Sequence, residues 1–252
     1  MRLIINADDC GKDARTDTHI KNLIASGKLS STTIMANMND FEGACNLYNH
    51  YHKIVSFGCH LNLTEGHPLI NSNEMIKQGY VIEKDDGLFF NGATFRKKTL
   101  NQNLKNAIFD ELNAQVLKLK KEGIKISHLD SHHHIHTSSN MFGIIAELSK
   151  RHNIPRIRRL RNWIPISINF YARQGWYYLA KLYNRSYIMS NFFCSYTEYF
   201  NNPRYHDIQK SDTIELMVHP GHSNEEYIKE EQMMLDMKNP SDIELISYNQ
   251  LL

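Results

Sequence analysis

Short apolar runs alternate with longer amphipathic segments along the chain. Runs rich in Ile, Val, Leu, Met and Thr predict strands at residues 3–6, 32–38, 54–60, 125–131, 156–160 and 213–219. Apolar residues at helical spacing predict helices over residues 17–26 and 103–122, each followed by a glycine. Because strands that alternate with helices are typical of βα units, the pattern predicts the α/β class with a mostly parallel sheet.

Two segments interrupt this alternation. Residues 80–90 place two short apolar runs around Asp86-Gly87, which predicts a β-hairpin inserted into the fold. Residues 166–202 are dense in Tyr, Phe, Trp and Asn without clean periodicity, and we interpret them as an insertion that forms a lid, a dimer contact or an ordinary packed segment. We find no internal repeat, so we expect one domain over residues 1–252.

Composition is that of an ordinary globular protein. Hydrophobic residues make up 41% of the chain and charged residues 22%, with a net charge of +2, which argues against disorder, a nucleic-acid partner and an anionic membrane. No apolar stretch is long enough for a membrane span or a signal peptide, so the expected compartment is the cytoplasm. The cysteines form no Cys-x-x-Cys pair, and we expect them to be small, mostly buried residues.

Acidic and histidine side chains stand at the ends of four predicted strands. They are Asp8 and Asp9, His60, Asp130 and His132, and His219. Since the carboxyl ends of parallel strands meet on one face, we expect these side chains to converge. A carboxylate and two imidazoles suit a divalent cation with an open position for water. The alternative for Asp8-Asp9 is a plain turn that ends a strand or caps a helix.

Histidine is the composition feature that sharpens this hypothesis, because 14 occur and five lie between residues 128 and 136. In an extended segment, alternation would put residues 128, 130, 132, 134 and 136 on one face and leave His133 on the other as a structural residue. The alternative is a polar loop with weak, adventitious metal binding. The scattered histidines receive no role: His19, His50, His52, His67, His152, His206 and His222.

Residues 156–161 (RIRRLR) form the one notable basic cluster. Alternation puts Arg156 and Arg158 on one face, where one of them can pair with a catalytic carboxylate. A solvated strand edge is an equally good interpretation. No recognition motif for nucleic acid accompanies the cluster, so we expect no such partner.

Four sequence blocks together resemble the YdjC-like carbohydrate deacetylase family. They are residues 6–11 (NADDCG), 58–64 (GCHLNLT), 128–136 (HLDSHHHIH) and 215–221 (ELMVHPG), which follow the family's order over nearly the whole chain. The resemblance implies a distorted (β/α) barrel-like fold that removes acetyl groups from N-acetylated sugars such as chitooligosaccharides. It also implies a divalent cation, usually magnesium, an acetylated mono- or oligosaccharide substrate, and a homodimer.

The same resemblance implies roles for single residues. Asp9, His60 and His132 match the metal ligands, Asp8 the general base, and His219 a candidate acid. The substrate-binding candidates are Asp130, Arg158 and His134, although Asp130 can instead orient a ligating imidazole.

Two features depart from the family pattern. Cys10 stands where the family usually has Phe, and the segment 166–202 matches poorly. We expect both departures to bear on how the substrate fits more than on how the metal binds.

The identity of the metal and the function of the protein both have alternative interpretations. Two imidazoles and one carboxylate suit zinc at least as well as magnesium. The functional alternatives are a metal-dependent phosphoesterase and a non-catalytic sugar-binding or metal-storage protein. Glycoside hydrolysis is less favoured, because the strand ends offer imidazoles where two opposed carboxylates are needed.

Overall fold

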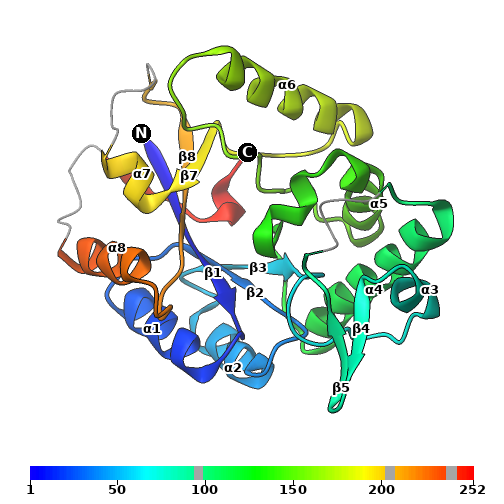
Figure 1. Ribbon diagram of the computed structural model, residues 1–252. Helices are drawn as coiled ribbons and strands as arrows, with labels where there is room; N and C mark the ends of the chain where they lie inside the picture. The colour runs from blue at the N-terminus through cyan, green and yellow to red at the C-terminus, as the bar shows by residue number, and fades with distance from the viewer. Residues whose placement is uncertain (94–98, 202–207, 237–242) are drawn as a thin grey trace.

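A curled, mostly parallel sheet forms the centre of the molecule (Figure 1). The computed structural model describes residues 1–93, 99–201, 208–236 and 243–252. The sheet order is β6-β3-β2-β1-β8-β7, and β9 pairs with the start of β1. The strands are β1 (Arg2–Cys10), β2 (Ser31–Ile34), β3 (Ser56–Leu61), β6 (Leu129–Ser131), β7 (Phe192–Ser195), β8 (Thr213–Val218) and β9 (Glu244–Leu245). The predicted α/β class with a barrel-like parallel sheet is confirmed.

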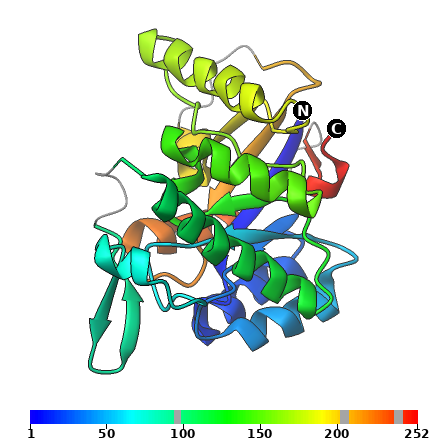
Figure 2. The ribbon, with the colours of Figure 1, turned by 90° about the vertical axis from the view of Figure 1, so that its right-hand side faces the viewer.

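Helices pack around the sheet, with α1 on β1, α4 on β3 and α8 on β8 (Figures 1 and 2). The longer ones are α1 (Ala14–Ala25), α2 (Phe41–Tyr51), α4 (Gln102–Lys121), α5 (Phe142–His152), α6 (Ile168–Tyr183) and α8 (Glu225–Asp236). The short ones are α3 (Asn73–Lys77), α7 (Tyr196–Asn201) and the 3-10 turns η1 (His132–Thr137), η2 (Ser139–Met141) and η3 (Tyr248–Gln250). Helix α1 begins three residues earlier than predicted, because the Asp13 side chain caps it by accepting from the Thr16 N–H at 2.8 Å.

The predicted strand at 156–160 is replaced by isolated bridges. Ile157 bridges Leu129 of β6, and Arg156 bridges Ile188. A few residues later, the Asn162 N–H donates to the Phe193 carbonyl of β7 at 3.1 Å. The segment thus pairs with each neighbour over too few residues to form a regular ladder of β-sheet hydrogen bonds. It connects the β6 edge of the curled sheet to the β7 edge.

Strand register brings the candidate site residues together. His60 pairs with Asp130 across β3 and β6, and Ala7 pairs with Val218 just before Asp8 and His219. The β1–β2 register shifts between Ala7 and Cys10, where Asp9 takes a left-handed φ of 66°. An undistorted strand would send two successive side chains to opposite faces. This bulge lets both acids line one cavity.

The inserted hairpin is confirmed, and it projects from the body of the molecule (Figure 2). Strand β4 (Val81–Lys84) pairs antiparallel with β5 (Gly87–Phe90). The two loop residues are Asp85 and Asp86, one position earlier than predicted. Gly87, with a φ of 132°, already pairs with Lys84 and so belongs to the strand.

The aromatic-rich segment contains a helix that its sequence did not predict; residue 202 lies outside the described residues. Helix α6 packs on α5 through Trp176, whose ring centroid lies 5.5 Å from that of Phe142. Its other faces leave Ile168, Tyr178 and Leu182 exposed. Its apolar residues do favour one side at helical spacing, so the expectation that this segment lacks clean periodicity is wrong for α6. Among the described residues that line the site cavity, none comes from α6.

Most buried apolar side chains belong to one continuous cluster, while the single-domain expectation stays a prediction. Cys10, Cys59 and Cys194 are buried and Cys45 is half-buried, all four as free thiols, as expected. Over the part of the chain that the structure describes, no helix combines the length and apolar character needed to cross a membrane.

Two glycine substitutions test the packing beneath the strand ends. A Cβ on Gly58 would lie 2.5 Å from Cε1 of His128 and 2.7 Å from Cγ2 of Thr33, so Gly58→Ala should lower the free energy of unfolding by about 1–3 kcal/mol. Gly175 of α6 has no atom within 4 Å of such a Cβ, and Gly175→Ala should raise stability by about 0.5–1 kcal/mol. Urea unfolding measures both, and equal effects would contradict this packing.

Candidate metal centre

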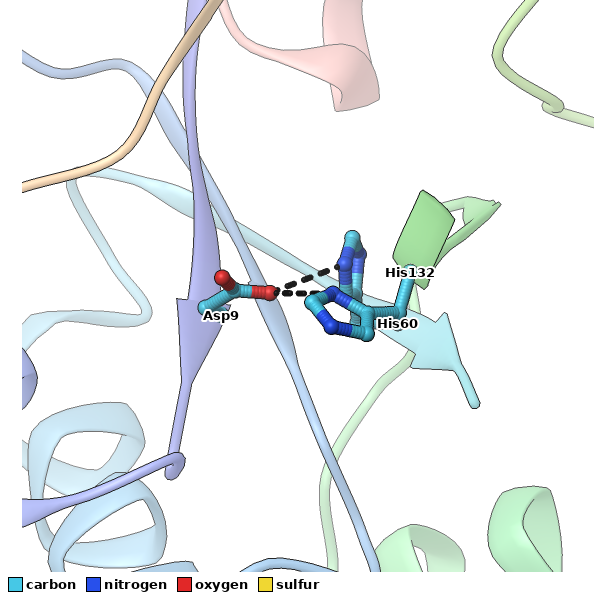
Figure 3. Close-up of side chains that lie close together, drawn as sticks. All are labelled: Asp9, His60 and His132. Carbon is cyan, nitrogen blue, oxygen red and sulfur yellow. Dashed lines mark ion pairs between the residues drawn. The ribbon is translucent and has the colours of Figure 1, made fainter. Parts of the chain in front are cut away.

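Three side chains from separate elements meet at the carboxyl end of the sheet (Figure 3). Asp9 comes from β1, His60 from β3 and His132 from η1. Oδ1 of Asp9 lies 3.2 Å from Nε2 of His60 and 2.9 Å from Nδ1 of His132. One ligand atom from each residue lies within 4.8 Å of the others. The structure therefore brings together the three residues for which the resemblance implies a metal.

The donor set and its surroundings fit a divalent cation. Oδ1 of Asp9 is buried and accepts no hydrogen bond from the described residues, although it faces two imidazole nitrogens. A buried oxygen without a hydrogen bond costs free energy unless another charge compensates it. One carboxylate and two imidazoles are ligands that zinc and related ions prefer.

Both histidine rings are held through their second nitrogen. Nδ1 of His60 lies 2.8 Å from Oδ1 of Asp130, and Nε2 of His132 lies 2.8 Å from Oε2 of Glu65. These contacts leave Nε2 of His60 and Nδ1 of His132 facing Asp9. A carboxylate behind a ligating imidazole fixes the tautomer and the orientation of its ring. For Asp130, this contact favours the orienting role over a direct contact with substrate.

Negative charge dominates the centre. Burial alone would lower the pKa of His60, but Asp130, Asp9 and Asp8 outweigh it and raise that pKa to about 10. Burial also opposes charge on His132, whose pKa is nevertheless raised by the nearby carboxylates of Asp9 and Glu65. The carboxylates thus favour positive charge at the imidazoles, and a bound cation would supply that charge in place of protons.

A fully buried arginine joins three carboxylates. Arg158 donates from Nη1 and Nη2 to Asp8 at 2.6 and 2.7 Å and from Nε to Glu215 at 2.6 Å, and its Nη1 lies 2.8 Å from Asp130. The other oxygen of Glu215 accepts from Tyr248. The expectation that an arginine of this cluster pairs with the candidate catalytic carboxylate is therefore confirmed. Its contact with substrate stays a prediction, because the guanidinium is 0% exposed.

Asp8 and Asp9 are neighbours with different surroundings. Burial would raise the pKa of Asp8, but the charge and hydrogen bonds of Arg158 outweigh it and hold that pKa far below its usual range. Asn6 also donates to Asp8 at 2.8 Å. Asp8 is therefore ionised and held by protein groups, whereas Asp9 faces the imidazoles.

The cavity above these residues has a volume of about 470 Å³. It is lined by Asp8, Asp9, Lys12, His60, Glu65, Ser131, His132, His133, His134, Arg161, Met217, His219, His222 and Tyr227. Nε2 of His219 lies 4.0 Å from Oδ2 of Asp8. Burial lowers the pKa of His219, so its ring is neutral at neutral pH.

The histidine-rich stretch does not stay extended. His133 and His134 take left-handed φ values of 52° and 55°, which turn the chain into η1 and end the predicted alternation after Ser131. His133 is exposed and lines the cavity, with Nδ1 2.9 Å from the Thr64 hydroxyl, so the expectation that it lies on the opposite face is wrong, while its structural role stays a prediction. His134 lines the cavity too, and its Nδ1 is buried without a hydrogen-bond partner among the described residues.

Two other members of the stretch lie away from the cavity. His128 is buried and stacks on Tyr248 with ring centroids 3.5 Å apart. His136 is buried, with Nε2 3.1 Å from the Arg158 carbonyl oxygen. Their contacts support the fold beneath the metal centre.

Sequence reasoning missed two residues of the centre. Glu65 directly follows the matched block 58–64, and His222 directly follows the block 215–221. Nε2 of His222 lies 3.0 Å from Oδ2 of Asp9, so a histidine that received no role from the sequence lies at the centre. His206, which also received no role, lies outside the described residues.

Comparison with known proteins agrees with this geometry. Residues 2–249 match the family model described as YdjC-like protein. The chain belongs to the YdjC-like family. It is 30% identical over 224 residues to a carbohydrate deacetylase of Clostridium beijerinckii, covering 88% of this chain and 82% of that one. It is 28% identical over 265 residues to a carbohydrate deacetylase of Halalkalibacterium halodurans, covering 98% and 100%.

A solved structure supports the fold of this YdjC-like chain. A crystal structure of an Enterococcus faecalis protein assigned to cellobiose-phosphate cleavage superposes with a TM-score of 0.75 at 20% identity, over 98% of this chain and 97% of that one. At this identity the likeness bears on the fold alone.

The buried arginine gives a stability test with a matched control. Arg158→Lys keeps the charge but cannot reach three carboxylates, so we expect a loss on the order of 3 kcal/mol in the free energy of unfolding. Arg151→Lys, at an exposed pair with Glu147, should cost less than about 0.5 kcal/mol. Urea unfolding compares the two, and equal losses would show that Arg158 does not hold these carboxylates together.

Proposed function

We propose that this protein is a metal-dependent carbohydrate deacetylase that removes N-acetyl groups from acetylated mono- or oligosaccharides. The observation that carries the proposal is the meeting of Asp9, His60 and His132 beside the ionised Asp8 in one cavity. Relatives that are carbohydrate deacetylases support the substrate class, and chitooligosaccharides are the first sugars to test.

Asp9, His60 and His132 are the residues that would hold the cation. When bound, a divalent ion would lower the pKa of a water molecule and polarise the acetyl carbonyl. Family resemblance favours magnesium, and the two imidazoles favour zinc.

Asp8 is proposed to take the proton of the attacking water. A general base must enter the reaction unprotonated, and Arg158 keeps Asp8 in that state while fixing both of its oxygens. The hydroxide formed from the water bonds to the acetyl carbon, and the carbon–nitrogen bond then breaks to release acetate.

His219 is proposed to deliver the proton to the departing amine. Because burial keeps its ring neutral, the proton that it donates must first arrive from within the site. Asp8, at 4.0 Å from Nε2 of His219, can supply it. The proton taken from water is then the one that the amine nitrogen receives.

The substrate contacts divide into direct and indirect ones. His134 lines the cavity, and we propose that its ring contacts the sugar. Asp130 and Arg158 lie beneath the cavity, and we propose that they act through His60 and Asp8.

Substitution of the proposed base separates chemistry from metal binding. Asp8→Asn should keep one ion per chain but release acetate from diacetylchitobiose about 10²–10⁴-fold more slowly, because the amide cannot accept the proton. Metal analysis and an acetate assay measure both quantities. His50→Ala serves as the control, since His50 is exposed on α2 and contacts the Asn46 carbonyl oxygen. Acetate release by Asp8→Asn at the wild-type rate would refute the assignment.

Metal removal tests the cation and the reaction class together. Chelator-treated protein should lose acetate release, and adding magnesium, manganese, cobalt or zinc in turn should restore it to different extents. A generic phosphomonoester is assayed in parallel. Phosphate release with no acetate release from any acetylated sugar would replace deacetylation by the phosphoesterase alternative.

A further inference from the structure

The turn after β8 carries His222 back to the metal centre. Gly221 has a φ of 78°, and a Cβ there would lie 2.9 Å from Cα of Thr16, so the turn requires glycine. The Gly221 N–H donates to Oε2 of Glu231 at 3.2 Å, which ties the turn to α8. The position of His222 is thus set by the backbone that precedes it.

His222 contacts the carboxylate oxygen of Asp9 that the other two candidate ligands do not face. Its Nε2 lies 3.0 Å from Oδ2, whereas His60 and His132 both face Oδ1. The His222 side chain is 21% exposed and that of Asp9 is 1% exposed, so the contact is shielded from water on the Asp9 side. With Oδ2 engaged in this way, Oδ1 is the oxygen that remains for a cation.

The orientation of the Asp9 carboxylate depends on the contact with His222, whereas that of Asp8 is set by other residues. Asp8 is fixed by Arg158 and Asn6, whereas Oδ2 of Asp9 is engaged by His222 and Oδ1 faces the two imidazoles at 2.9 and 3.2 Å. The left-handed backbone of Asp9 also leaves the regular strand, so the strand alone does not set the direction of its side chain. A partner on Oδ2 is what fixes the carboxylate.

The ring of His222 is itself held in place. Tyr227 of α8 packs against it with ring centroids 5.4 Å apart at 81°, and against His219 at 4.6 Å. The same helix therefore supports the proposed proton donor and the partner of Asp9.

We propose that His222 is a positioning residue that holds Asp9 as a one-oxygen ligand and thereby sets the affinity of the centre for its cation. It acts through Asp9 and not on the substrate. The inference rests on the metal site of the proposed function. In that site His222 would supply a fixed hydrogen-bond donor to the carboxylate of Asp9, just as Asp130 and Glu65 supply acceptors to the second nitrogens of the two imidazoles.

Direct titration of the metal-free chain with Zn²⁺ and Mn²⁺ tests the proposal. His222→Ala should bind each ion about 10- to 100-fold more weakly, the usual effect of losing a partner of a ligand. His222→Gln should recover most of that affinity, because its amide nitrogen can donate from nearly the same place as Nε2. His50→Ala, on the exposed side of α2, should match the wild type.

Two further readouts separate positioning from other roles. The melting temperature of the metal-free variants should stay near that of the wild type, while the rise on adding metal should shrink for His222→Ala and return for His222→Gln. The electronic spectrum of the Co²⁺-loaded protein should keep its shape in both variants. A spectrum typical of a lost ligand would make His222 a metal ligand and overturn the proposal, and so would unchanged affinity in His222→Ala.

Failure of this inference can be told apart from failure of the proposed function. Titration reads binding and not acetate release, so a wild-type chain that binds the ion without deacetylating any sugar would refute the deacetylase proposal and leave the role of His222 standing. If His222→Ala does not fold, the affinity of His222→Gln compared with that of the bulkier, non-donating His222→Leu decides the question.

Discussion

The guanidinium of Arg158 is the interaction on which the centre depends. It is fully buried and contacts carboxylates from β1, β6 and β8, namely Asp8, Asp130 and Glu215. Burying several like charges is costly unless each is paired and hydrogen-bonded. Burial raises the pKa of Glu215 to about 7, but Asp8 and Asp130 still share one guanidinium, and Asp130 lies next to His60. A site that attracts a cation follows from this imbalance.

The bulge in β1 gives the two successive carboxylates, Asp8 and Asp9, different surroundings. Asp8 is bound on both oxygens by Arg158, while Asp9 presents one oxygen to two imidazoles. The first carboxylate is held ionised, as the proposed proton transfer requires, and the second faces the imidazoles, as the proposed metal site requires. A regular strand would have pointed them to opposite faces.

The parts of this arrangement that follow from strand ends could be predicted from sequence. Apolar runs marked where β1, β3, β6 and β8 end, and parallel strands bring such ends together. The pattern therefore placed Asp9, His60 and His132 among the candidates at strand ends, and the family resemblance distinguished them as the expected ligands. Glu65 and His222 lie on loops, where no strand or helix periodicity decides in which direction a side chain points. For His222 that direction is set by the backbone turn at Gly221. Helix α6 was missed although its apolar residues favour one side at helical spacing, because the aromatic residues that crowd it are ones that strands prefer. The strand predicted at 156–160 is absent because bridges to two different neighbours divide the segment.

The location of the ion is the most direct test of the account. A second group of possible ligands, Asp8, His60 and Asp130, lies nearby, but Arg158 already contacts both of its carboxylates. Anomalous diffraction from crystals soaked in Mn²⁺ or Zn²⁺ distinguishes the two groups. We expect one peak bonded to Oδ1 of Asp9, Nε2 of His60 and Nδ1 of His132. A peak between Asp8 and Asp130, with Arg158 displaced, would contradict it.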